Sequence, residues 1–220
     1  MDTKNCPTSV EDIEFYKENG FIQYPNFFSK EEIKDLGDAV DDAITCNRDR
    51  ILGAENGGRG SEDYEKVFNQ MVNLWCDYPS VKSYSLNQRL AESARRLSDG
   101  QHVRIYHDHA MIKPAGEISK ETNWHQDSPY WPMDPIGSLS AWVAVDDVTL
   151  ENGCLHFIPK SHKYGSPPSK LDTVTTNYPL WIVDQQTVKA LVKENGIVSA
   201  HGKAGTVVIF VDNLVHGSAQ

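Results

Sequence analysis

The chain has 220 residues, of which 39% are hydrophobic and 10% aromatic, and this composition is typical of one globular domain with a substantial core. A formal net charge of −10 argues against a nucleic-acid partner, because phosphate binding needs a basic surface. No apolar run approaches the ~18 residues of a membrane-spanning helix, and no signal-peptide core opens the chain. The four cysteines form no CxxC motif, so we expect free thiols and a cytoplasmic protein.

Two capping boxes mark helix starts in the first fifty residues. Ser9 and Asp12 have the spacing at which each side chain bonds the other residue's backbone N–H, and Gly20 supplies a C-terminal stop. Ser29 and Glu32 repeat the pattern ahead of a second helix with one apolar stripe. This stripe is ordinary core, and no chemistry is assigned to it.

The rest of the first hundred residues is expected to be mainly helical, apart from one short strand and one loop. Residues 21–25 predict a short strand that a proline ends, and residues 53–60 form a glycine-rich polar loop without a phosphate-binding motif. We expect helices over 68–75 and 79–97.

From residue 102 the hydrophobic period changes to two, which predicts strands over 102–114, 138–147, 154–159 and 206–212. A long connection over 163–203 separates the last two, and one short helix is expected in it over 184–194. Connections of this length are uncommon unless they act as lids or binding loops.

Helices followed by several short strands indicate an α+β domain whose sheet part is a jelly roll. We expect one domain over 1–220, mainly helical over 1–100, with a jelly-roll core over 101–220 and the helices packed against it. The sequence shows neither repeats nor low-complexity segments.

Residues 123–132, with the sequence NWHQDSPYWP, carry the strongest chemical signal. If this segment is extended, His125 and Asp127 point to the same side, as two ligands of a 2-His-1-carboxylate iron site. His216 is the most suitable third ligand, because an apolar strand leads to it and Gly217 permits close approach. The alternative is a surface histidine and aspartate in a polar turn.

Aromatic residues surround this motif and could form an apolar pocket wall. Tyr130 and Trp131 follow it directly, and Trp142 lies on the next strand. His107 and His109 share a strand face and could form an HxH metal pair. No similarly placed carboxylate or cysteine accompanies them, so we favour a place in the pocket lining or a structural hydrogen bond. Gln126 and Asn213 either orient the ligands or are solvated.

The sequence resembles the phytanoyl-CoA dioxygenase family. The resemblance begins with FYKENGFI at 15–22 and continues in the same order through most of the chain. The later motifs are YHD at 106–108, KPAG at 113–116, WHQD at 124–127, YWP at 130–132, WVAVDD at 142–147, ENGCL at 151–155, IPKSH at 158–162 and HGS at 216–218.

This resemblance implies a double-stranded β-helix, cupin-like in form, with N-terminal and flanking helices. It also implies an oxygenase that uses Fe(II), 2-oxoglutarate and O₂. It assigns His125, Asp127 and His216 to the metal. Contacts to the 2-oxoglutarate co-substrate are assigned to Met111, Trp142, Ser218 and Gln70. The substrate pocket is expected at His107, His109, Tyr130 and Trp131.

The expected reaction is hydroxylation of a small organic molecule, coupled to decarboxylation of 2-oxoglutarate to succinate. Family members that halogenate have a small residue at the place of Asp127, so the carboxylate favours hydroxylation. The alternative is a non-catalytic or truncated jelly-roll protein that retains the His/Asp/His set as a metal-binding site.

One feature departs from the family pattern. Its members bind the distal carboxylate of 2-oxoglutarate with an arginine about ten residues after the second metal histidine. In this chain the last residue, Gln220, follows His216 by four positions, and Arg104 is the last arginine. A final strand with the arginine beyond Gln220, substitution by Arg104 or Lys113, or loss of 2-oxoglutarate turnover would each account for this difference.

Overall fold

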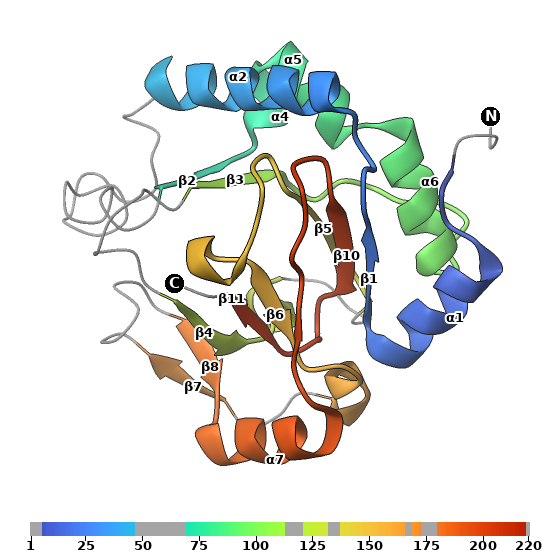
Figure 1. Ribbon diagram of the computed structural model, residues 1–220, viewed down its shortest axis with the longest axis vertical. Helices are drawn as coiled ribbons and strands as arrows, with labels where there is room; N and C mark the ends of the chain where they lie inside the picture. The colour runs from blue at the N-terminus through green and yellow to red at the C-terminus, as the bar shows by residue number, and fades with distance from the viewer. Residues whose placement is uncertain are drawn as a thin grey trace.

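The computed structural model describes residues 6–46, 69–112, 121–131, 137–165, 169–172 and 180–218. Two antiparallel sheets lie face to face in the centre, and helices cover the outer sides (Figure 1). This is the expected α+β arrangement with a cupin-like jelly roll. Within the described residues, no helix has both the length and the apolar character needed to cross a membrane.

The described strands form three sheets. The three-stranded sheet has the order β1 (Phe21–Tyr24), β10 (Val207–Val211), β5 (Leu139–Val143). The six-stranded sheet has the order β7 (Ser169–Asp172), β8 (Leu180–Val183), β4 (Thr122–His125), β11 (His216–Ser218), β6 (Leu155–Phe157), β9 (Val198–Ser199). The third sheet has two antiparallel strands, β2 (Asn69–Val72) and β3 (His109–Ile112).

The helices lie on three sides of the sheets (Figure 1). They are α1 (Val10–Asn19), α2 (Lys30–Cys46), α4 (Leu74–Asp77), α5 (Pro79–Ser85), α6 (Gln88–Leu97) and α7 (Gln185–Asn195), with the short 3-10 helices η4 (Ser128–Tyr130), η5 (Leu150–Asn152) and η6 (Ser161–Tyr164). The predicted helices at 79–97 and 184–194 are confirmed, the first as two helices.

Both predicted capping boxes are present. Asp12 N–H donates to Ser9 Oγ at 3.1 Å, and the Asp12 carboxylate accepts from Ser9 N–H at 2.7 Å. At the start of α2, Ser29 and Glu32 make the same pair of bonds at 3.2 and 2.8 Å. Local side-chain chemistry therefore determines where these two helices begin.

Strand β10 explains how the layers are held together. Val207 and Ile209 pack with the apolar side chains of α1, α2 and α6, whereas Val208 and Phe210 point to the second sheet. Alternation along the strand thus gives β10 one face for the helices and one for the other sheet, so its residues form a continuous apolar run. The Phe157 ring stands 5.2 Å from the ring of Phe210 and fills the space between the sheets.

Two predictions for local structure were wrong. Residues 69–72, expected in a helix, form β2, which pairs with β3 (Asn69 opposite Ile112, Val72 opposite His109). Of the long strand expected over 102–114, only residues 109–112 pair with another strand in the part of the chain that the structure describes. Strand pairing, not local sequence, determines both results: β3 extends as far as β2 accompanies it. The glycine-rich loop at 53–60 lies outside the described residues.

The connection over 163–203 contains more regular structure than expected. Besides the predicted helix, it supplies β7, β8 and β9, and β8 places Ile182 opposite His125. This segment therefore extends the six-stranded sheet on both sides, and its described part does not form a separate lid.

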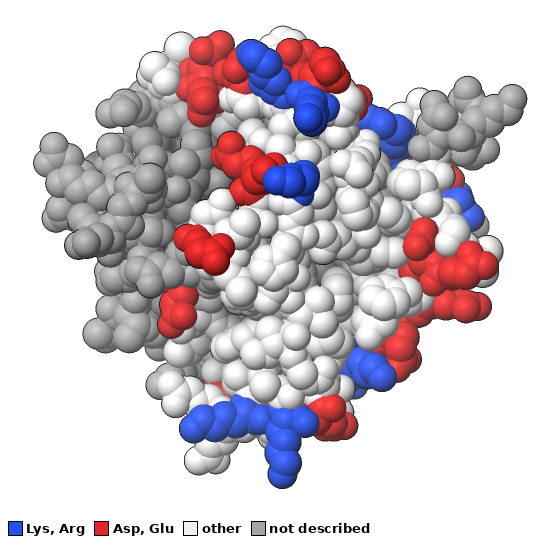
Figure 2. Space-filling view, in the orientation of Figure 1, with Lys and Arg blue, Asp and Glu red and all other residues white. Residues whose placement is uncertain are grey.

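Charged side chains surround the face seen in Figure 2, and its centre is largely uncharged. Acidic groups alternate with basic partners, as in the pairs Lys34–Asp38 at 2.5 Å, Lys203–Asp147 at 2.6 Å and Lys160–Glu18 at 2.9 Å. On this face the negative net charge is therefore dispersed and forms no single acidic field.

Candidate metal and co-substrate site

His125 and Asp127 come together differently from the simple extended arrangement. His125 is the last residue of β4, whereas Asp127 already has helical backbone angles (φ −78, ψ −34) and precedes η4. The backbone turns because the N–H groups of Asp127 and Ser128 both donate to the carbonyl of Asp212, at 2.8 and 3.0 Å. This turn after β4, held by the residue that follows β10, brings the carboxylate back beside the imidazole.

His216 completes the cluster from the neighbouring strand. It lies directly opposite His125 in the β4–β11 pair, and their ring centroids are 4.2 Å apart. Asp127 Oδ1 is 3.8 Å from His125 Nε2 and 3.7 Å from His216 Nε2. These separations exceed hydrogen-bond lengths, so three ligand atoms converge without bonding one another. Among the described residues, this is the one group of three or more potential ligands within 4.8 Å.

The remaining ring nitrogens fix the orientation of both histidines. His125 Nδ1 lies 2.8 Å from the carbonyl of Asn123, and His216 Nδ1 lies 2.9 Å from the carbonyl of Leu214. A carbonyl can only accept, so each Nδ1 carries the proton and each Nε2 presents a lone pair to the cluster. Burial, assisted by the neighbouring His216, lowers the pKa of His125 to about 4, which keeps this imidazole neutral at pH 7. The donor set therefore fits a divalent transition metal such as Fe(II).

Three residues that the sequence reasoning missed hold Asp127 in place. Ser140 Oγ donates to Asp127 Oδ2 at 3.1 Å. Ser138 Oγ donates to Asp212 Oδ2 at 2.6 Å, behind the carbonyl that fixes the turn. The signal for them in the sequence is weak: the two serines alternate along a strand, and Asp212 ends another strand four residues before His216.

Gln126 and Asn213 connect the site to the surrounding loops. Gln126 is buried, and its side-chain amide donates to the carbonyls of Asn213 and Gly165. Asn213 in turn donates to the carbonyl of His162 at 3.0 Å. Of the two alternatives for Gln126, solvation is therefore wrong, and both side chains cross-link the segments that carry the ligands.

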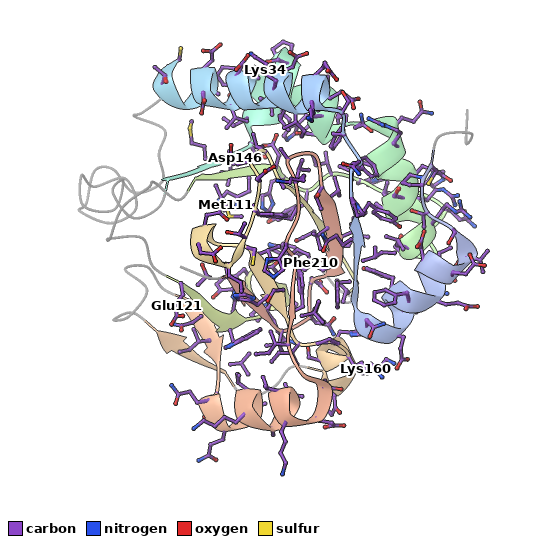
Figure 3. All side chains as sticks on the ribbon, viewed as in Figure 1. Lys34, Met111, Glu121, Asp146, Lys160 and Phe210 are labelled. Carbon is purple, nitrogen blue, oxygen red and sulfur yellow. The ribbon has the colours of Figure 1, made fainter. Side chains whose placement is uncertain are left out.

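The residues expected to contact 2-oxoglutarate lie around the triad. Ser218 is buried in β11, two residues beyond His216, and Trp142 lies half-buried in β5 opposite Val208. Met111, from β3, is 44% exposed. In Figure 3 it lies away from the centre of the molecule, where Phe210 is found. Gln70, in β2, lies opposite Met111 of β3, and the Gln70 side chain is outside the described part of the structure.

The expected substrate residues form an aromatic cluster at the same cavity. The ring of His107 lies 6.2 Å from that of Trp131 and 6.1 Å from that of His109, and Tyr130 is 40% exposed. These four residues line one cavity together with the triad, Met111, Trp142 and Ser218. Its volume of about 2520 Å³ exceeds that of a site for one small ligand (~300–1,000 Å³), because the cavity continues along α2.

Four other histidines stay outside the triad. His156 Nδ1 is 2.8 Å from Ser199 Oγ, and His162 Nε2 donates to the carbonyl of Lys17 at 3.2 Å. His102 and His201 are exposed.

Comparison with known proteins gives a consistent result. The family model for phytanoyl-CoA dioxygenase (PhyH) matches residues 16–220. Ectoine dioxygenase of Sphingopyxis alaskensis is 26% identical to the chain, over 98% of the chain and 72% of its own length. Peroxisomal phytanoyl-CoA dioxygenase of Bos taurus is 24% identical, over 99% of the chain and 65% of its own length.

Two solved structures share the fold. The non-heme alpha ketoglutarate dependent carbocyclase SnoK from nogalamycin biosynthesis superposes with a TM-score of 0.77 at 23% identity, covering 98% of the chain and 79% of SnoK. EctD from S. alaskensis, solved with 2-oxoglutarate and 5-hydroxyectoine, has a TM-score of 0.75 at 25% identity, covering 100% of the chain and 73% of EctD.

The jelly roll, the His/Asp/His cluster and these relatives define an oxidoreductase of the Fe(II)/2-oxoglutarate-dependent dioxygenase class, with Fe(II), 2-oxoglutarate and O₂ as cofactor and co-substrates. The chain belongs to the phytanoyl-CoA dioxygenase family, as its motifs implied.

Proposed function

We propose that the protein hydroxylates a small organic molecule and couples this reaction to decarboxylation of 2-oxoglutarate to succinate. The observation that carries the proposal is the convergence of three ligand atoms, His125 Nε2, His216 Nε2 and Asp127 Oδ1, in one cluster. When bound there, Fe(II) supplies the activation of O₂ that attack on an unactivated C–H bond requires.

His125, Asp127 and His216 hold the metal in this proposal. Two neutral imidazoles and one carboxylate reduce the charge of Fe(II) to about +1 and leave open positions for co-substrate and O₂. The two histidines keep a fixed orientation because backbone carbonyls hold their Nδ1 protons. The similarity to ectoine and phytanoyl-CoA dioxygenases supports a small-molecule substrate.

The surrounding side chains divide between co-substrate and substrate. We assign Met111, Trp142, Ser218 and Gln70 to 2-oxoglutarate, and His107, His109, Tyr130 and Trp131 to the substrate. The support is that the residues other than Gln70 line the same cavity as the triad. Their aromatic rings would exclude water around the reacting carbon. We also propose that residues 1–220 form a single oxygenase domain, and the four free cysteines support a reducing, cytoplasmic location.

Succinate formation tests the proposed reaction. The purified protein is incubated with Fe(II), ascorbate and 2-oxoglutarate in air, with a panel of cyclic solutes, amino acids and acyl thioesters, and succinate is quantified. Succinate well above that of a His125→Ala variant supports the proposal. If the two proteins give equal amounts under all conditions, hydroxylation coupled to 2-oxoglutarate is excluded.

Replacing the carboxylate tests the ligand assignment independently of turnover. Asp127→Ala removes one of three ligands, so we expect the dissociation constant of Co(II), measured calorimetrically as a stand-in for Fe(II), to rise more than about tenfold. Asp42→Ala, at an exposed aspartate of the helix α2, is the matched control and should bind as the wild type does. Equal affinity of the Asp127→Ala and wild-type proteins would refute the assignment.

A further inference from the structure

The two carboxylate oxygens of Asp127 are in different environments. Oδ1 faces the two histidines, at 3.7 and 3.8 Å from their Nε2 atoms. Oδ2 accepts a hydrogen bond from Ser140 Oγ at 3.1 Å. One oxygen therefore points into the site, and the other is held by the neighbouring sheet.

Ser140 is well placed to act as a rigid donor. It lies inside β5, opposite Phe210 of β10, in the three-stranded sheet. The ring of Phe210 packs 4.7 Å from that of His216, so the strand that fixes Ser140 also borders a second ligand. A hydroxyl on a paired strand has little freedom to follow a moving carboxylate, and this makes its hydrogen bond directional.

The backbone of Asp127 is fixed separately. Its N–H donates to the carbonyl of Asp212 at 2.8 Å, and Asp212 N–H donates to the carbonyl of Ser138 at 3.0 Å. With the main chain fixed, the principal freedom left to Asp127 is rotation of its side chain. The Ser140 hydrogen bond acts on that rotation.

We propose that Ser140 is a positioning residue that makes Asp127 present a single oxygen to the metal. This inference rests on the proposed role of Asp127 as a metal ligand and extends it. Without the hydroxyl, the carboxylate can rotate and offer both oxygens to the ion. The second oxygen would then occupy a position that 2-oxoglutarate or O₂ needs.

Ser140→Ala tests this inference in the Co(II) protein, without turnover. We expect two changes: Co(II) binding weakens about 10- to 100-fold, and the visible absorption of bound Co(II) changes because its ligand set changes. The affinity of the Co(II) protein for 2-oxoglutarate should fall as well. Ser85→Ala is the matched control, because Ser85 Oγ also donates to an aspartate, Asp108 Oδ2, at 2.8 Å.

A second pair of variants separates the hydroxyl from the space it fills. Ser140→Thr and Ser140→Val have nearly the same shape, and only threonine keeps the donor. We expect the threonine variant to stay within about threefold of the wild type and the valine variant to behave as Ser140→Ala does. This comparison decides the question even if the alanine variant is unstable.

The possible results separate the two proposals. Wild-type Co(II) affinity and spectrum in both the alanine and valine variants would overturn the role of Ser140 and leave the triad intact. If Asp127→Ala itself bound Co(II) as the wild type does, the triad would fail first. Loss of binding in the threonine and valine variants alike would show that packing, not the hydroxyl, matters at this position, which also overturns the inference.

Discussion

Each metal-facing histidine uses one ring nitrogen for the backbone and leaves the other for the site. The two acceptors, the carbonyls of Asn123 and Leu214, both stand two residues before the histidine they hold. Each histidine is therefore oriented by the backbone of its own chain segment and needs no partner side chain for its tautomer. Asp127 has no such local support, and for this reason it depends on Ser140 and on the Asp212 carbonyl.

His162 makes stability depend on pH. Its half-buried ring donates from Nε2 to the carbonyl of Lys17, and Nδ1 is buried without a hydrogen-bond partner among the described residues. Burial lowers the pKa of His162 below its usual value of 6.5. The unfolded chain therefore binds this proton more readily, and the contribution is complete above about pH 6.5 and decreases as the pH falls below it.

Urea unfolding at several pH values between about 7.5 and 5 measures this effect. We expect the free energy of unfolding to decrease less with acidification in His162→Gln than in the wild type, because the variant lacks this titrating group. Some decrease should persist in the variant, since other titrating groups remain. Equal decreases in the two proteins would contradict a role for His162.

The sequence was sufficient to predict that His125, Asp127 and His216 come together, because their residue types, the strand before His216 and the family motifs around them are visible in it. Ser140 and Asp212 could not be found in this way. Ser140 meets Asp127 only because β5 pairs with β10, and Asp212 contributes a backbone carbonyl, which every residue has. What orients a ligand depends on tertiary structure, whereas the ligand itself depends on residue chemistry.

At the scale of elements, the β4–β11 pair brings together the two histidines of the proposed metal site. His125 and His216 face each other across it, and the register shifts between His216 and Ser218. Gly217 lies at this irregularity, where an added Cβ would be 2.6 Å from the carbonyl oxygen of Thr122. The two backbones can approach this closely only because the position carries no side chain.

Gly217→Ala should therefore disturb the site through the backbone. We expect lower thermal stability and a Co(II) dissociation constant raised at least about tenfold, since β11 must move away from β4 and take His216 with it. Gly37→Ala is a suitable control: its Cβ would meet only a Val145 methyl, at 3.1 Å, and alanine favours the helix α2 by about 1 kcal/mol. Wild-type Co(II) affinity in Gly217→Ala would show that the close approach does not matter.

Helix ends were easier to predict than strands. The Ser9 and Ser29 boxes are complete within four residues, and the structure forms both. Strands need a partner. Residues 102–108 were expected to belong to a strand, but in the described structure β2 pairs only with residues 109–112. The strands β7 and β8 were missed because their own pattern is weak: β8 pairs with β4, which is far away in sequence, and β7 joins the sheet only through β8.

For the whole molecule, the sheets and the outer helices form consecutive layers around β10. One core cluster joins the helices to this strand, and another joins the strand to the six-stranded sheet. The second cluster ends at the site, where Phe210 packs against His216. Packing between the sheets therefore supports the ligands directly, and damage to this core should weaken metal binding as well as the fold.

Metal binding should in turn stabilise the whole fold. The proposed ligands come from two strands that lie side by side only in the native state, so the ion binds the folded protein preferentially. At a free Co(II) concentration of about 100 times the dissociation constant, linkage predicts about 2.7 kcal/mol of added stability. Calorimetric melting with Co(II) and with a chelator measures it. An unchanged melting temperature in the wild type, or an equal rise in Asp127→Ala, would argue against a site held by the triad.

The strand order also has a consequence for biosynthesis. In the described part of the three-stranded sheet β1 has β10 as its neighbour, and in the six-stranded sheet β4 reaches β6 only through β11. The ribosome therefore releases β1 well before β10, and His125 well before His216. The nascent chain must keep the apolar face of β1 protected, by α1 or by a chaperone, until β10 emerges. If His125, Asp127 and His216 hold the ion as proposed, the complete site cannot form during translation before His216 has left the ribosome.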